Sequence, residues 1–147
     1  MYLACALERL FGYGGIDVAV GDAAMTRHLL LVIANGSRFC GSFRIAPSAD
    51  VSDGLLDVVA IADASAARRV HLLAAATQGA HVAMRGVSVT GTSGLLLRFR
   101  AAPIYEVDGD LSRAAAPEVA VRCVPRALRV ITSASCAAPA RPSESAR

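Results

Sequence analysis

The apolar residues of this chain are gathered in strand-sized segments that turn residues separate at close intervals. The segments are rich in valine, isoleucine, leucine and phenylalanine, and several end at Asn-Gly, Asp-Gly or proline, as strands commonly do. The longest apolar stretch, residues 28–34, is far shorter than the roughly 20 residues that cross a bilayer as a helix. The sequence therefore predicts a β-rich chain without a transmembrane helix. The strands expected are residues 16–20, 27–34, 55–62, 86–92, 95–100, 104–107, 119–124 and 128–132, and residues 39–46 form a further segment before a polar turn.

One helix is expected inside the chain, running to about Gln78. Ser65 is the expected N-cap, and Gly79 is expected to end the helix because glycine accepts the left-handed conformation that closes many helices. The inner side of this helix should carry Val70, Leu72, Leu73 and Ala76. Residues 2–11 have the apolar spacing of a second helix, ended by Gly12, Gly14 and Gly15. The fold predicted is mainly β, of the α+β type, with one or two helices.

A chain of 147 residues normally forms one domain. Its composition, 54% hydrophobic and 18% charged, is that of a globular protein and excludes a wholly disordered chain. After residue 132 the sequence is mostly serine, alanine, proline and arginine, with nothing to anchor it in a core. We expect one domain over residues 1–132 and a disordered tail over residues 133–147.

The positive charge is modest and spread along the chain. All 15 basic residues are arginine, so the chain has no lysine for a phosphate-binding P-loop. The net charge of +3 would help a surface meet anionic lipid head groups but forms no polybasic cluster. We therefore expect no nucleic-acid partner. The one adjacent pair, Arg68 and Arg69, is interpreted as a solvated helix face rather than a binding patch.

The cysteines and the N-terminus indicate an intracellular protein. The four cysteines form no Cys-x-x-Cys pair, so neither a zinc site nor a disulfide framework is expected, and buried thiols are the preferred interpretation. The first ten residues lack the basic start and small-residue cleavage site of a signal peptide. A cytoplasmic location follows as the default expectation.

Two acidic turns are candidates for chemistry: residues 50–57 and residues 106–110. Each can be explained as an ordinary turn, because Asp-Gly is a common hairpin sequence. The first could also bind a hard divalent cation through the Asp53 carboxylate and backbone carbonyls. In the second, Asp110 follows Gly109 and could act as a general base toward a substrate hydroxyl. Both interpretations stay open on the residues alone.

The combination of motifs resembles a known family. Its first part is Ala34-Asn35-Gly36, then Gly41 to Ala49 (GSFRIAPSA), then Asp53 to Val58 (DGLLDV). Gly79-Ala80-His81, Val107 to Asp110 (VDGD) and Pro125 to Val130 (PRALRV) follow in the family's order. This string, over roughly residues 2–132, resembles the C-terminal domain of bacterial diacylglycerol kinase-like lipid kinases, relatives of the sphingosine kinases. The resemblance implies a β-sandwich-like domain of the lipid kinase and NAD kinase-like fold.

Several residue roles are implied by the resemblance. Asp53 corresponds to the aspartate of a magnesium site whose other protein ligands are backbone oxygens, here those of Asp50 and Leu55. Asp110 corresponds to the residue that takes the proton from the lipid hydroxyl. Relatives usually have glutamate there, and aspartate sets the carboxylate back by about 1.5 Å, roughly one C–C bond. Cys40 stands where relatives tend to have glycine. His81 corresponds to a frequent histidine, for which we prefer a structural role.

The implied activity is transfer of the γ-phosphoryl group of ATP to the hydroxyl of diacylglycerol or a similar lipid. The Gly-Gly-Asp-Gly-Thr motif with which relatives bind ATP does not occur in this chain. ATP would therefore be bound mainly by an N-terminal kinase domain, in cis or in trans, and we expect this chain to be inactive alone. A sandwich separated from that domain would expose an apolar face, which favours oligomers, and a peripheral membrane contact fits a lipid substrate.

Two other functions are considered. The first is a non-catalytic lipid-binding or regulatory module that has kept the sandwich and lost the ATP-binding half. Three observations favour this module: aspartate at position 110 where relatives have glutamate, Cys40 where they tend to have glycine, and the absence of the Gly-Gly-Asp-Gly-Thr motif from this sequence. The related sandwich of NAD kinases fits less well, because the stretch DGLLDV and the Asp-Gly-acid turn match the lipid enzymes better.

Overall fold

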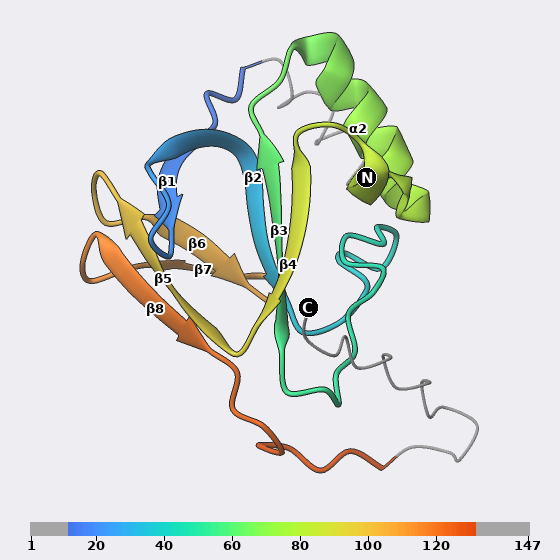
Figure 1. Ribbon diagram of the computed structural model, residues 1–147, viewed down its shortest axis with the longest axis vertical. Helices are drawn as coiled ribbons and strands as arrows, with labels where there is room; N and C mark the ends of the chain where they lie inside the picture. Colours follow the sequence, from blue (N-terminus) through green and yellow to red (C-terminus); the bar gives the residue numbers. More distant parts are fainter. Residues whose placement is uncertain (1–11, 132–147) are drawn as a thin grey trace, which may run out of the picture.

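The computed structural model describes residues 12–131, which form two antiparallel sheets, one long helix and a short 3-10 helix (Figure 1). The mainly β fold with one internal helix is thus confirmed. The elements are β1 (Ile16–Val20), β2 (Thr26–Ala34), β3 (Leu56–Ala62), α2 (Ala66–Gln78), η1 (Ala80–Ala83), β4 (Val87–Thr92), β5 (Gly94–Phe99), β6 (Ile104–Val107), β7 (Asp110–Arg113) and β8 (Glu118–Arg122). The expected helix over residues 2–11 and the tail over residues 133–147 lie outside the described residues.

The larger sheet has the strand order β4-β3-β2-β1-β5-β8, and the hairpin of β6 and β7 forms a sheet of its own. Strand β2 pairs with β1 at Thr26 to His28 and with β3 at His28 and from Leu30 to Ala34. The pairing with β3 shifts register between His28 and Leu30, and such an irregularity bends a strand. β1, β5 and β8 therefore lie at an angle to β2, β3 and β4 (Figure 1), which gives the sheet its sandwich-like form.

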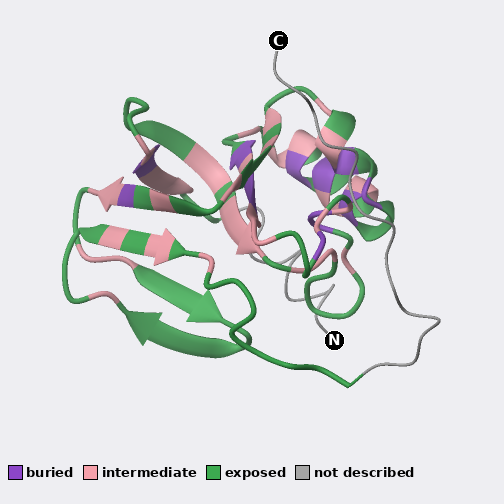
Figure 2. Cartoon of the chain, turned by 60° about the horizontal axis from the view of Figure 1, so that its bottom comes forward, coloured by how far each residue is buried: buried purple, intermediate pink, exposed green. Residues whose placement is uncertain are grey.

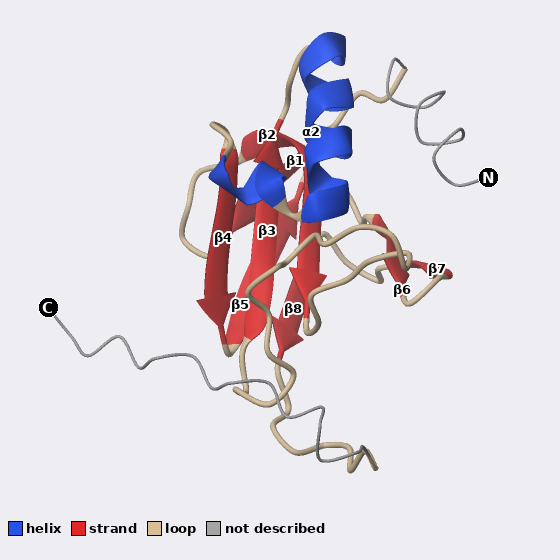
Figure 3. Cartoon of the chain, turned by 90° about the vertical axis from the view of Figure 1, so that its right-hand side faces the viewer, coloured by secondary structure: helices blue, strands red, loops and turns tan. Residues whose placement is uncertain are grey.

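The core lies between α2 and the β2–β4 part of the sheet (Figure 3). Val59 and Ile61 alternate along β3 and face Leu72 from the helix, and Ile45 and Ala46 from the loop before β3 close the cluster. Burial of each large apolar side chain stabilises the fold by about 1.5–3 kcal/mol. Leu72 and Ala76 are buried as expected, whereas Val70 is 38% exposed, so the inner face of the helix is narrower than predicted.

The loop that leads into β3 is attached to the end of α2. Gly79 caps the helix at φ +79°, and a Cβ placed there would lie only 2.6 Å from Pro47 Cγ. The Arg44 amide donates to the Ala76 carbonyl at 2.9 Å, and the His81 ring bonds to the Ile45 carbonyl at 3.0 Å. The helix end therefore fixes the path of residues 44–47, just before the first acidic turn.

Arg69 is buried, so the interpretation of both adjacent arginines as a solvated face is wrong for this residue. Its guanidinium donates to the carbonyls of Ala64 and Tyr13, both at 2.8 Å, and to Asp63 Oδ1 at 2.7 Å. Arg69, followed by the Ala64 amide, lowers the pKa of Asp63 from its usual value. The side chain joins the segment before β1 to the β3–α2 connection, a long-range role that helical spacing could not predict.

The structure differs from the sequence-based expectation at two strands, and it also shows what the apolar segment 39–46 forms. Residues 39–46 form no strand, but a tight turn closed by a single bridge between Phe39 and Phe43, with Cys40 and Gly41 both at positive φ. Residues 128–131 are not a strand. Residues 110–113 form β7, which was not predicted because Asp110 and Ser112 are poor strand formers that pairing with β6 nevertheless holds in register.

The β6–β7 hairpin is exposed along its whole length, whereas α2 and β3 both contain several buried residues (Figure 2). No helix among residues 12–131 combines the length and apolar character needed to cross a membrane.

Candidate functional site

The first acidic turn is held by its own side chains. Asp50 is 9% exposed, and its Oδ1 accepts hydrogen bonds from the Ser52 amide at 2.9 Å and the Ser52 hydroxyl at 2.6 Å. Asp53 Oδ1 accepts the Leu55 amide at 2.8 Å, across Gly54 at φ +74°. Aspartate stabilises turns by bonding to the backbone two residues on. Two consecutive turns of this kind therefore fix the backbone from Asp50 to Leu55.

The residues assigned to a magnesium site share this one loop. Asp53 is exposed, and the carbonyl oxygen of Asp50 accepts the Asp53 amide only at a long 3.4 Å. Hard cations such as Mg²⁺ prefer oxygen ligands, so a carboxylate with two backbone carbonyls fits their chemistry. Among residues 12–131, no three His, Cys, Asp or Glu side chains are grouped so as to hold a metal ion. A cation here would thus depend on backbone oxygens.

A buried carboxylate lies beside this loop that sequence reasoning gave no role. Asp57, at the start of β3, is 2% exposed, and the Ser48 hydroxyl lies 3.5 Å from its Oδ1. Its Cα pairs with Ala34 on one side and Gly91 on the other. A carboxylate buried in a central strand must be hydrogen-bonded to be tolerated. The signal in the sequence was a lone acidic residue inside the apolar segment 55–62.

The segment after β8 passes beside the first acidic turn. A Cβ placed on Gly54 would lie 3.6 Å from Pro125 Cγ, an ordinary contact distance. Pro125 opens the motif PRALRV, which is distant from Gly54 in sequence. The fold therefore brings together two of the motifs on which the family resemblance depends.

The second acidic turn lies in the β6–β7 hairpin. Asp108 and Gly109 have φ values of +51° and +100°, and the Gly109 amide donates to Glu106 Oε1 at 2.6 Å. Positive φ at both central residues is typical of two-residue hairpin turns, for which Asp-Gly is a preferred sequence. Asp110 follows as the first residue of β7 and is exposed. It belongs to the two-stranded sheet, whereas the loop of Asp50, Asp53 and Leu55 leads into β3 of the larger sheet.

The surroundings of His81 suit a structural role. The residue is fully buried, and burial lowers the pKa of its imidazole. Because the Ile45 carbonyl can only accept, the ring nitrogen Nε2 carries the proton, and Nδ1 has no hydrogen-bond partner within residues 12–131. A neutral, buried ring that ties η1 to the loop before β3 agrees with the structural role expected for it.

Two cysteines can be compared with the expectation of buried thiols. Cys40 is exposed, so the expectation is wrong there, and Cys123 is half-buried. Cys40 adopts φ +48°, a conformation that favours glycine. The turn itself therefore accounts for the glycine that the resemblance places at this position. Cys5 and Cys136 lie outside the described residues.

Comparison with known proteins identifies the family. The family described as "YegS C-terminal NAD kinase beta sandwich-like domain" matches residues 1–132. The fold is similar to the crystal structure of a "putative diacylglycerol kinase" from Bacillus anthracis, with a TM-score of 0.61 and 11% sequence identity. The match covers 82% of this chain but only 43% of the Bacillus anthracis chain. No curated protein matches. This chain belongs to the family of C-terminal domains of YegS and diacylglycerol kinase-like lipid kinases.

Proposed function

We propose that this chain is the lipid-side half of an ATP-dependent lipid kinase that phosphorylates the hydroxyl of diacylglycerol or a similar lipid. The observation that carries the proposal is the exposed carboxylate of Asp110, presented by a tight Asp-Gly hairpin turn in a chain of this kinase-like family. The Bacillus anthracis protein of similar fold, described as a diacylglycerol kinase, adds support for the substrate class.

In this mechanism Asp110 takes the proton of the lipid hydroxyl while the hydroxyl oxygen attacks the γ-phosphorus and ADP leaves. A general base must come within roughly 3 Å of the proton that it removes, so it has to reach the substrate from the surface. Exposed Asp110 meets that condition. Phosphoryl transfer depends mainly on positioning and charge neutralisation, which the ATP-binding half would provide in cis or in trans.

Asp53, with the backbone oxygens of Asp50 and Leu55, would hold Mg²⁺ in the first acidic turn. Bound there, the ion would supply positive charge and rigidity to the loop that enters β3. The two turn-forming hydrogen bonds of Asp50 and Asp53 already shape the loop, so little reordering is needed to bind the ion.

The hairpin supports docking to a further kinase domain. Ile104, Val107 and Leu111 are 61%, 57% and 77% exposed, and an isolated two-stranded hairpin is only marginally stable. Apolar residues on such a hairpin favour a covering partner. We propose that the ATP-binding half covers it, and a second copy of this chain or contact with a membrane surface are the other occupants to test.

The test is reconstitution with ATP and diacylglycerol. The DNA upstream of Met1 is examined for an in-frame Gly-Gly-Asp-Gly-Thr region, and that half is joined to this chain or added as a separate protein. The chain alone should be inactive and the combination active. Asp110→Asn should abolish turnover, whereas Asp22→Asn, an exposed carboxylate elsewhere, should not. Full activity of Asp110→Asn would exclude Asp110 as the base.

A non-catalytic lipid-binding module is the second candidate, because Asp110 is one methylene shorter than the usual glutamate. Asp110→Glu separates the two functions. A kinase should keep or gain activity, since the carboxylate moves forward by about 1.5 Å. Lipid binding that is independent of ATP, with no activity in either variant of the reconstituted protein, would favour the binding module.

A further inference from the structure

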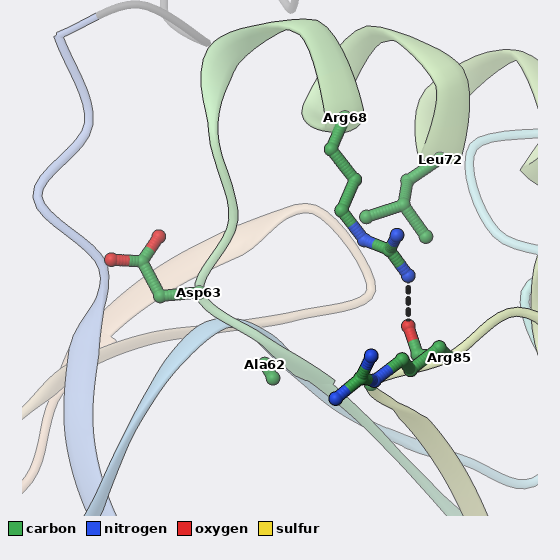
Figure 4. Close-up of a pocket in the computed structure, with 6 residues that line it drawn as sticks. Ala62, Asp63, Arg68, Leu72 and Arg85 are labelled. Carbon is green, nitrogen blue, oxygen red and sulfur yellow. Dashed lines mark hydrogen bonds between the residues drawn. The ribbon is translucent and has the colours of Figure 1, made fainter.

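A pocket of about 290 Å³ lies between the first turns of α2 and the turn that enters β4 (Figure 4). Its lining residues are Ala62, Asp63, Arg68, Leu72, Arg85 and Gly86. Ala62 ends β3, whereas the first acidic turn precedes that strand. A strand of seven residues is about 20 Å long, so the pocket is separate from the proposed magnesium loop.

Two guanidinium groups line this pocket from different elements. Arg68 comes from α2, and its Nη2 donates to the backbone carbonyl of Arg85, which precedes β4 (Figure 4). In the described part of the chain neither arginine forms an ion pair with a carboxylate. Two like charges near each other are unfavourable without a counter-charge. The pocket therefore favours an anion.

The acidic residue of the lining does not supply that counter-charge. Asp63 bonds to Arg69 at 2.7 Å, and its carboxylate points away from the two guanidinium groups of the pocket (Figure 4). The first turn of α2 contains no acidic residue, and its N-cap Ser65 forms no side-chain capping bond. No carboxylate of this turn therefore neutralises the Arg68 guanidinium.

The shape and chemistry of the pocket indicate the kind of anion. Leu72, 4% exposed, forms an apolar part of the lining, and Gly86 adds no side chain. Ligand pockets are roughly 300–1,000 Å³, so this one lies at the lower limit and suits a small molecule or a head group. Guanidinium groups bind phosphate with paired, charge-assisted hydrogen bonds.

We propose that this pocket binds a phosphate monoester through Arg68 and Arg85. The phosphate belongs either to a small soluble molecule or to the head group of a lipid such as phosphatidate, and the chemistry of recognition is the same. The site does not depend on the proposed kinase activity, because none of its residues belongs to the acidic turns.

The soluble arm of the test is a calorimetric titration of the full chain with glycerol 3-phosphate at low ionic strength. Arg68→Gln and Arg85→Gln should each weaken binding by about tenfold or more, because each removes a charge-assisted contact. The matched control is Arg122→Gln, which removes the same charge from an exposed position on β8 and should leave binding unchanged. Thermal unfolding of each variant checks that it is folded.

The lipid arm is sedimentation of the chain with phosphatidylcholine vesicles that contain phosphatidate, compared with vesicles in which phosphatidylserine gives the same surface charge. Retention on phosphatidate that both pocket variants lose assigns the phosphate to a lipid. If the pocket variants lose only glycerol 3-phosphate binding, the phosphate belongs to a soluble molecule. Saturable binding of neither, or an equal loss in the Arg122→Gln control, overturns the proposal.

Discussion

Replacing Gly79 with alanine tests how the helix end holds the loop before the first acidic turn. Gly79 adopts φ +79°, and a Cβ there would lie 2.6 Å from Pro47 Cγ and 3.4 Å from Arg44 Cβ. A distance below 3.0 Å forces a shift, and the neighbour is a proline ring, which cannot rotate away. Both backbone strain and steric overlap therefore oppose the substitution.

The loss of stability combines these two effects with a smaller opposing effect on the unfolded chain. The left-handed conformation costs an alanine about 1–2 kcal/mol. Forcing a methyl group into a packed site costs about 1–3 kcal/mol. The reduced entropy of the unfolded chain returns about 0.4–1 kcal/mol. The free energy of unfolding should fall by about 3 kcal/mol.

The assay is urea unfolding of the full chain followed by circular dichroism, with Gly21→Ala as the matched control. Gly21 has φ +59°, and a Cβ placed there would meet nothing within 4 Å, so only the backbone strain remains and the loss should be about 1 kcal/mol. In the Pro47→Ala background Gly79→Ala should cost less, because the Cγ atom is gone. Equal losses for Gly79→Ala and Gly21→Ala would refute the steric argument.

Three further outcomes are expected. Arg69→Met should lower the free energy of unfolding by about 2–4 kcal/mol, because it leaves its partners without their charged donor. Arg100→Met, at a surface ion pair, should lower the free energy of unfolding by less than about 1 kcal/mol. Similar urea midpoints for the two variants would contradict a stabilising role for the buried Arg69 contacts. Burial lowers the pKa of His81 below its ordinary 6.5, so the unfolded chain binds more protons below that pH. Stability should therefore fall between pH 7.5 and 5.5, and less so in His81→Gln. Mg²⁺ should raise the melting temperature of the chain but not that of Asp53→Asn, and equal shifts would exclude Asp53 as a ligand.

Local chemistry made several elements predictable. The helix over residues 66–78 begins after Ser65, although that side chain forms no capping hydrogen bond, and ends at Gly79, which adopts the left-handed conformation expected of a C-cap glycine. The hairpin turn followed from Asp108-Gly109, and β1 and β6 have the predicted bounds. In these places the signal lies within a few residues, so no tertiary contact was needed to read it.

Other features depended on partners distant in the sequence. The segment 39–46 is apolar enough for a strand, but positive φ at Cys40 turns the chain back on itself. Arg69 looks like any helical surface arginine until Tyr13 and Asp63 are placed beside it. The contact of Pro125 with Gly54 is invisible to spacing for the same reason.

The two acidic turns differ in how much of their surroundings this chain supplies, which separates cation binding from catalysis. The first turn is closed by the side chains of Asp50 and Asp53 and lies against Pro125, so its backbone is fixed within this chain. The second lies on a hairpin whose residues are all exposed. Under the proposed function, Mg²⁺ binding should be measurable on the isolated chain, whereas a role for Asp110 should emerge only when another domain covers the hairpin. Asp53→Asn should therefore weaken Mg²⁺ binding by the isolated chain, whereas Asp110→Asn should lower only the activity of the assembled enzyme.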